Sequence, residues 1–252
     1  MADHVLSNSP AHRLVDTSPR CGPPVLSAGA VLLAAAGTVA ALTSAGSAYV
    51  MAAVIAYLPV AAGVMIAAPR AHPYPVFGLA NGITLFRAVL VCLAAGLIAT
   101  PEVLATPAHE WLLVAGVTLA LVLDLADGWT ARHQRLASEF GGRFDMEVDA
   151  WSMLILSGVV VIQSAAPVWA LAIGLARYGF IVAGLLMPLL AAPLPPSRRR
   201  RAVCGMQVIA LGALLAPSLP AAASWPIAAA ALAALALSFA LDICWLIRTA
   251  RR

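Results

Sequence analysis

Eight long apolar segments constrain the fold of this chain more than any other feature. They lie at residues 26–45, 49–68, 80–99, 111–128, 146–164, 168–192, 202–218 and 225–247. Each is about long enough to cross a hydrocarbon layer of about 30 Å as a helix, and none alternates as a strand would. Only 10% of the residues are charged, against about 25% in soluble domains. The sequence therefore predicts an all-α integral membrane protein and excludes a water-soluble globule.

The positions of the arginines predict the orientation of these segments. If the N-terminus is inside, the cytoplasmic loops receive Arg70, the 132–143 stretch and the 198–201 run. The opposite loops, at 46–48, 100–110, 165–167 and 219–224, contain no Arg. Cytoplasmic loops are enriched in basic residues, so we expect eight spans with both termini inside a bacterial cytoplasmic membrane. The net charge of +4 has this topological explanation, and we expect no nucleic-acid partner.

The chain divides into three regions. Residues 1–24 are polar and lack the order of a signal peptide, and we expect a disordered cytoplasmic tail there. Residues 25–69 form two additional transmembrane helices in this prediction. Residues 70–252 start with an interfacial segment rich in Pro and aromatic residues, followed by a six-helix catalytic bundle.

Aspartates cluster at the junction of the fourth and fifth apolar segments. Asp124 and Asp127 are three residues apart, so they share one face of a helix. Gly141, Asp145 and Asp149 are spaced by four and form one ridge at the start of the next helix. Because the loop between the two helices is short, we expect them to be antiparallel neighbours. Four aspartates then converge near the cytoplasmic edge of the membrane.

Carboxylates gathered at the edge of a low-dielectric layer repel one another unless cations neutralise them. Hard divalent cations prefer oxygen ligands, so we expect two Mg²⁺ or Mn²⁺ ions at the four aspartates. Two such ions form a clamp for phosphoryl transfer on a diphosphate. Gly128, Ala131 and Gly141 are small enough for a nucleotide to approach the backbone, and Arg132 can hold a phosphate bidentately. The plainer alternative, a helix stop with solvated loop charges, leaves the two aspartate ridges unexplained.

The pattern Asp124-x2-Asp127-Gly128-x2-Ala131-Arg132-x8-Gly141-x3-Asp145-x3-Asp149 resembles the signature of the CDP-alcohol phosphotransferase family at every defined position. Upstream, residues 81–87 (NGITLFR) resemble the family's Asn-x-Leu-Thr-x-x-Arg segment, with Ile83 where Leu is usual. The resemblance extends from about residue 75 onward. It implies the family's six-helix bundle, here with two additional N-terminal helices outside it.

The resemblance also implies an activity and a set of site residues. Family members displace CMP from a CDP-linked lipid, here CDP-diacylglycerol, with the hydroxyl of a polar alcohol, phosphorylated or not, in phospholipid biosynthesis. Asp124, Asp127, Asp145 and Asp149 would hold two divalent ions, and Asp149 would also be the general base. The nucleotide-binding residues would be Asn81, Thr84, Gly128, Ala131, Arg132 and Gly141. A homodimer is implied by the resemblance alone.

Arginines outside the signature predict where the acceptor alcohol binds. Arg177 falls near the middle of the sixth segment, where an unpaired guanidinium is costly and usually functional. Together with Arg87, Arg200 and Arg201 it favours an acceptor that carries a phosphate. Each also has a structural alternative: an ion pair for Arg177, anchoring at the interface for Arg87, and a topology signal for the 198–201 run.

Two other classes of membrane protein also place carboxylates in helices. Membrane prenyltransferases bind a prenyl diphosphate through Mg²⁺, but their two aspartate motifs lie in separate halves of the bundle. Here all four aspartates fall between residues 124 and 149. An ion-coupled transporter would place acidic residues near the middle of its spans and would show repeated halves. Both alternatives fit this sequence less well than the transferase.

Overall fold

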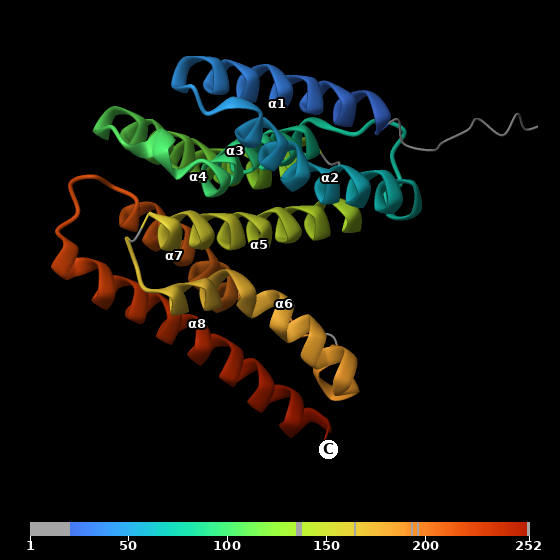
Figure 1. The fold of residues 1–252 in the computed structure, drawn as a ribbon. Coiled ribbons are helices and arrows are strands. Elements are labelled where there is room, and N and C mark those ends of the chain that lie inside the picture. Colours follow the sequence, from blue (N-terminus) through green and yellow to red (C-terminus); the bar gives the residue numbers. More distant parts are fainter. Residues whose placement is uncertain (1–20, 135–137, 164, 193, 196, 251–252) are drawn as a thin grey trace, which may run out of the picture.

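The computed structural model describes residues 21–134, 138–163, 165–192, 194–195 and 197–250, with the backbone alone over 125–134. Within this part the chain is helical and contains no strand, which confirms the predicted all-α class (Figure 1). Three short 3-10 helices are η1 (Pro101–Leu104), η2 (Val168–Ala170) and η3 (Pro188–Ala191). The α-helices are α1 (Gly22–Thr43), α2 (Gly46–Ala71), α3 (Leu79–Ala99), α4 (Pro107–Gln134), α5 (Glu139–Ile162), α6 (Leu171–Leu186), α7 (Arg198–Leu214) and α8 (Ala221–Ala250).

Six of the described helical segments are long and apolar enough to cross a membrane. They are α1, α2, α3, the Pro107–Asp124 part of α4, the Val168–Leu186 stretch and α8. Eight spans were expected from the sequence, and α5 and α7 are the two that differ. Charged residues interrupt the first half of α5, while α7 has only 17 residues and begins with four arginines. The chain is thus a multi-pass integral membrane protein whose α5 and α7 are more polar than the remaining helices.

Helix boundaries differ from the predicted ones at α1, α4 and α6, and prolines account for the differences at α1 and α6. α1 begins at Gly22, inside the predicted tail, with Pro in its first turn, where a missing N–H costs nothing. Residues 1–20 of that tail lie outside the described residues. α6 ends at Leu186 rather than at residue 192 because Pro188 follows shortly after it. α4 stays helical to Gln134, so its connection to α5 is shorter than expected.

Helix α5 occupies the centre of the bundle. It packs against α2 and α3 on one side and against α6 and α7 on the other (Figure 1). Its buried residues run along its whole length, from Phe140 to Val160. Side chains on both sides of α5 therefore pack against neighbouring helices.

The two N-terminal helices form a hairpin that is fastened to α3. Ser44 and Gly46 have positive φ angles in the turn between α1 and α2. The Tyr49 hydroxyl donates to the Leu93 carbonyl of α3 at 2.8 Å. The same ring packs on Gly96, where an added Cβ would lie 2.5 Å from a ring carbon. The hairpin thus belongs to the bundle rather than standing apart from it.

Helices α5 and α6 cross closely at Gly174. A Cβ built on this residue would lie 2.4 Å from the Cα of Leu154 and 2.8 Å from the carbonyl oxygen of Met153. Small residues allow helix backbones to approach in membranes, and this crossing requires one.

Replacing Gly174 with Ala should destabilise the protein by about 1–3 kcal/mol, because the added methyl meets backbone atoms that cannot rotate away. Thermal unfolding in detergent would measure the change. Gly179→Ala is the matched control, since it lies in the same helix with nothing within 4 Å of the added Cβ. Equal unfolding temperatures for the two variants would contradict the prediction.

Candidate active site

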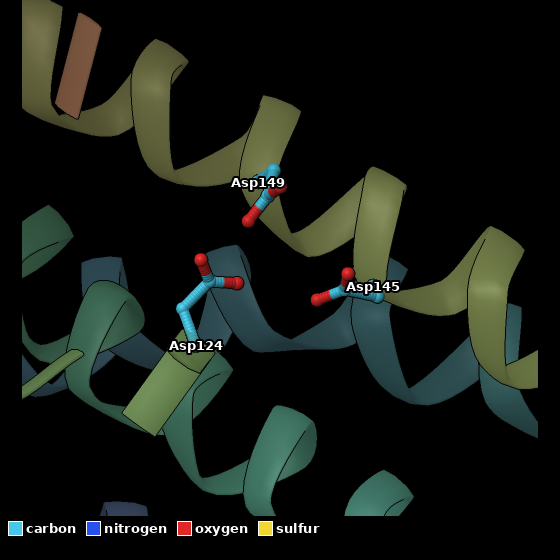
Figure 2. A group of neighbouring side chains, drawn as sticks. All are labelled: Asp124, Asp145 and Asp149. Carbon is cyan, nitrogen blue, oxygen red and sulfur yellow. The ribbon is translucent and has the colours of Figure 1, made fainter. Parts of the chain in front are cut away.

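Three of the four predicted aspartates converge as half-buried side chains between α3, α4 and α5. Asp124 comes from α4, and Asp145 and Asp149 come from adjacent turns of α5 (Figure 2). One carboxylate oxygen from each lies within 4.8 Å of the others. Asp127 lies one turn beyond Asp124 on α4, but its side chain is outside the described part of the structure. Three of the four carboxylates therefore meet as expected, but in the described part of the chain α4 and α5 are not the directly packed neighbours that the short loop predicted, because each packs mainly on α3.

Arg87 of α3 lies among these carboxylates. Its Nη1 is 2.9 Å from Asp124 Oδ1 and 2.7 Å from Asp145 Oδ1. Its Nη2 is 2.6 Å from Asp149 Oδ1. The arginine is 5% exposed. Arg87 was predicted to bind the acceptor, whereas its guanidinium points at the aspartates.

The chemistry of this cluster fits divalent cations. The three carboxylates outnumber the guanidinium beside them, so the cluster retains an excess of negative charge. Their oxygens are the ligands that Mg²⁺ and Mn²⁺ prefer. One oxygen from each carboxylate lies within 4.8 Å of the others, close enough for the three to coordinate a shared cation. Asp124, Asp145 and Asp149 are the described residues that could hold such ions.

A cavity of about 1290 Å³ borders the cluster. Its polar part includes the three aspartates and Arg87, together with Arg177, Arg200 and Arg201. The rest is lined mostly by aliphatic side chains of α3, α4 and α5, such as Leu97, Leu113 and Leu156. The cavity therefore suits an amphiphile, with a charged group at the carboxylates and an apolar chain beyond them.

The predicted nucleotide residues that the structure describes lie together at the start of α3 and α5. Asn81 and Thr84 are buried on α3. Gly141 of α5 faces Asn81, because an added Cβ would lie 2.9 Å from the Asn81 Oδ1. These three residues are near the aspartates but are not among those lining the cavity. Gly128, Ala131 and Arg132 belong to the last turns of α4, and their side chains lie outside the described part.

Arg177 has features of both roles that the sequence left open, a structural ion pair and binding of the acceptor. It forms an ion pair with Glu147 of α5, which is the structural alternative. It also borders the cavity, as an acceptor-binding residue would. Its Nε is buried without a hydrogen-bond partner among the described residues.

The arginines at the start of α7 are attached to α8 through Asp242. Arg200 Nη1 is 3.2 Å from Asp242 Oδ1, and Arg200 also donates to the Pro195 carbonyl. Arg199 pairs with the same carboxylate and donates to the Ser238 carbonyl at 2.6 Å. Arg201 is exposed. Arg200 and Arg201 both line the cavity, whereas Arg199 serves to join the two helices.

Two contacts of the site were not predicted. The Cys204 thiol of α7 lies 3.7 Å from Asp149 Oδ2, and no spacing in the sequence links these residues. Glu147 stands between Asp145 and Asp149 in the chain, yet it points to α6 and Arg177. The direction of Glu147 could have been predicted from helical periodicity, because a residue two positions away lies on the other side of a helix.

The fold and this centre define an integral membrane protein with an acidic cluster beside an amphiphilic cavity. A family model for CDP-alcohol phosphatidyltransferase matches residues 77–241, well over half of the chain. The chain belongs to this family, as its resemblance implied, and is a membrane transferase of phosphate-containing groups. The matched region starts just before α3, so α1 and α2 precede it. Comparisons with curated proteins and with solved structures gave no match.

Removing the guanidinium of Arg87 should destabilise the protein in the absence of divalent cations. Arg87→Met leaves three close carboxylates without their cation, at a cost of about 3 kcal/mol for partly buried charges. Added Mg²⁺ should recover much of this loss, as thermal unfolding with and without the metal would show.

The matched control for this prediction is Arg143→Met. Arg143 forms an exposed pair with Glu139 in the same region of α5, and such pairs contribute about 1 kcal/mol or less. An Arg87 variant as stable as the Arg143 variant in metal-free buffer would contradict the prediction.

Proposed function

We propose that the protein transfers the phosphatidyl group of CDP-diacylglycerol to the hydroxyl of a polar alcohol and releases CMP, as a step of phospholipid biosynthesis. The observation that carries this proposal is the convergence of Asp124, Asp145 and Asp149 on an amphiphilic cavity. Family membership supports transfer from a CDP-alcohol. The apolar lining supports a donor with acyl chains.

The aspartates have two roles in this proposal. Asp124, Asp127, Asp145 and Asp149 hold two divalent cations, Mg²⁺ or Mn²⁺, which when bound neutralise the diphosphate and stabilise the leaving CMP. Asp149 is also the general base. It accepts the proton of the acceptor hydroxyl as the alcohol oxygen bonds to the phosphorus of the phosphatidyl group and the bond from that phosphorus to CMP breaks. Arg87 holds one oxygen of Asp149 in place.

The nucleotide is proposed to lie against the start of α3 and the facing ends of α4 and α5. Asn81 and Thr84 offer polar side chains, and Gly141, which has no Cβ, lets the Asn81 side chain lie directly against the start of α5. Gly128, Ala131 and Arg132 complete this set by family resemblance. The arginine distribution favours a cytoplasmic position for this end of the bundle, with both termini inside a bacterial membrane. The resemblance also favours a homodimer.

The acceptor is proposed to bind among Arg177, Arg200 and Arg201, which line the cavity together with the aspartates. Three guanidinium groups match an acceptor that carries a phosphate, because arginine binds phosphate oxygens in a bidentate manner. The Arg177 Nε is a donor still available to such a group. Arg87 lies at the boundary between this region and the carboxylates.

Asp145→Asn and Asp149→Asn should each lower CMP release by about 100-fold or more, because each removes a charge from the reacting centre. The measurement is CMP release in proteoliposomes containing CDP-diacylglycerol, a panel of polar alcohols and Mg²⁺ or Mn²⁺. Glu139→Gln is the control, since this exposed carboxylate lies on the same helix away from the cluster. Unchanged turnover by Asp145→Asn would rule out the carboxylate site, and a wild-type protein that released CMP with no alcohol would contradict the function.

Arg177→Gln should raise the KM for the acceptor by about tenfold, the effect of losing one hydrogen bond to a charged group. The KM for CDP-diacylglycerol should stay within about twofold, because the donor is anchored by its nucleotide and acyl chains. Steady-state kinetics with each substrate varied in turn would measure both constants, with Arg143→Gln as control. Equal increases in the two KM values would place Arg177 outside the acceptor site.

A further inference from the structure

A buried histidine joins the N-terminal hairpin to the start of α5. His72 follows α2 directly and is 5% exposed. Its Nε2 lies 2.9 Å from the Val76 carbonyl oxygen, and its Nδ1 lies 3.0 Å from the Ser138 Oγ. Because a carbonyl oxygen only accepts, Nε2 carries the proton, and in the neutral ring Nδ1 accepts from the Ser138 hydroxyl.

Ser138 transmits this contact to α5 because it is the N-cap of that helix. Its Oγ accepts a hydrogen bond from the Gly141 amide at 3.0 Å. Asp145 follows Ser138 by about two helical turns and Asp149 by about three, so all lie along one face of α5. The position of the cap thus determines where the ridge of carboxylates begins.

A second hydrogen bond fastens α5 to α2 on the far side of the carboxylates. The Trp151 Nε1 donates to the Ala56 carbonyl of α2 at 3.1 Å. The two helices run antiparallel, since residue 56 meets residue 151 and residue 72 meets residue 138. Asp145 and Asp149 lie between the two attachments, which are about 20 Å apart along α5.

Aromatic packing holds the His72 ring in the orientation that this contact needs. Phe140, in the first turn of α5, packs edge-on against His72 with ring centroids 5.6 Å apart. Phe140 also stacks on Phe144 at 5.7 Å and contacts Phe77 of the segment before α3. The histidine therefore cannot turn away from Ser138 without disturbing this cluster.

We infer that His72 is a positioning residue, which sets the Asp145 and Asp149 side chains for metal binding by fixing the Ser138 cap of α5. The inference rests on the proposed function for the role of the metal. In this inference the N-terminal hairpin has a structural role, because α2, which precedes the matched family region, braces the helix that carries the carboxylates. His72 is not among the residues that line the cavity.

The test uses the full chain in lipid nanodiscs, with Mn²⁺ binding followed by electron paramagnetic resonance. His72→Ala and Ser138→Ala should each weaken Mn²⁺ binding about fivefold, the effect of one lost hydrogen bond. The double variant should bind as weakly as Ser138→Ala alone, because both substitutions remove the same contact. Gln163→Ala is the matched control. It breaks a hydrogen bond to the Pro101 carbonyl at the other end of α5 and should leave Mn²⁺ binding unchanged.

His72→Asn separates positioning from folding. Its side-chain oxygen can take the place of Nδ1 and accept from Ser138, so Mn²⁺ binding should return to within about twofold of the wild type. In kinetics, His72→Ala should lower kcat with little change in the acceptor KM. If His72→Ala does not fold, the test is whether His72→Asn binds Mn²⁺ more tightly than Ser138→Ala does.

Failure of the inference and failure of the proposed function give different results. Folded His72→Ala and Ser138→Ala variants that bind Mn²⁺ as tightly as the wild type would overturn the inference and leave the function intact. A wild-type protein that binds no Mn²⁺, or whose binding survives Asp145→Asn, would overturn both.

Discussion

Repulsion among three carboxylates held within 4.8 Å of one another is the constraint on which the structure depends. At the edge of a membrane such charges are costly unless cations lie among them. The chain supplies one cation itself, the buried guanidinium of Arg87, which contacts all three aspartates. The remaining negative charge is the basis of the proposed binding of divalent metals. The site is therefore both a source of instability and the centre of the proposed chemistry.

Holding such a cluster together requires a rigid surrounding structure, and α5 shows how it is built. The helix lies at the centre of the bundle and approaches α6 so closely that only Gly174 fits. On its other side, two hydrogen bonds attach it to α2 and to the residue that follows α2. Ser138 makes one of them before the carboxylates, and Trp151 makes the other after them. Repulsion cannot be relieved by a shift of α5 without breaking these contacts. The hairpin outside the family region thus braces the helix that carries the carboxylates, and its residues Val39, Leu42 and Tyr49 also line the cavity.

Much of this arrangement could be predicted from local sequence patterns. Apolar length predicted the helices, and the three- and four-residue spacings predicted that Asp124, Asp145 and Asp149 would meet. Contacts between distant segments could not be predicted in this way. The Arg87 guanidinium reaches aspartates about 40 to 60 positions away, and no periodicity reveals which partner it selects. The end of α6 was missed because the apolar pattern continues through Pro188, which interrupts the helix for steric reasons.

In the proposed function, acidic residues at every second position from 145 to 149 of α5 allow one helix to serve two substrates. Asp145 and Asp149 face α3 and α4, whereas Glu147 between them faces α6 and pairs with Arg177. Successive acidic residues therefore hold the proposed donor centre on one side of the helix and an acceptor arginine on the other. Both sides border the same cavity. Arg177 belongs to α6 and is joined to α5 through Glu147, so one helix orients both groups, and transfer between two bound substrates requires such relative positioning.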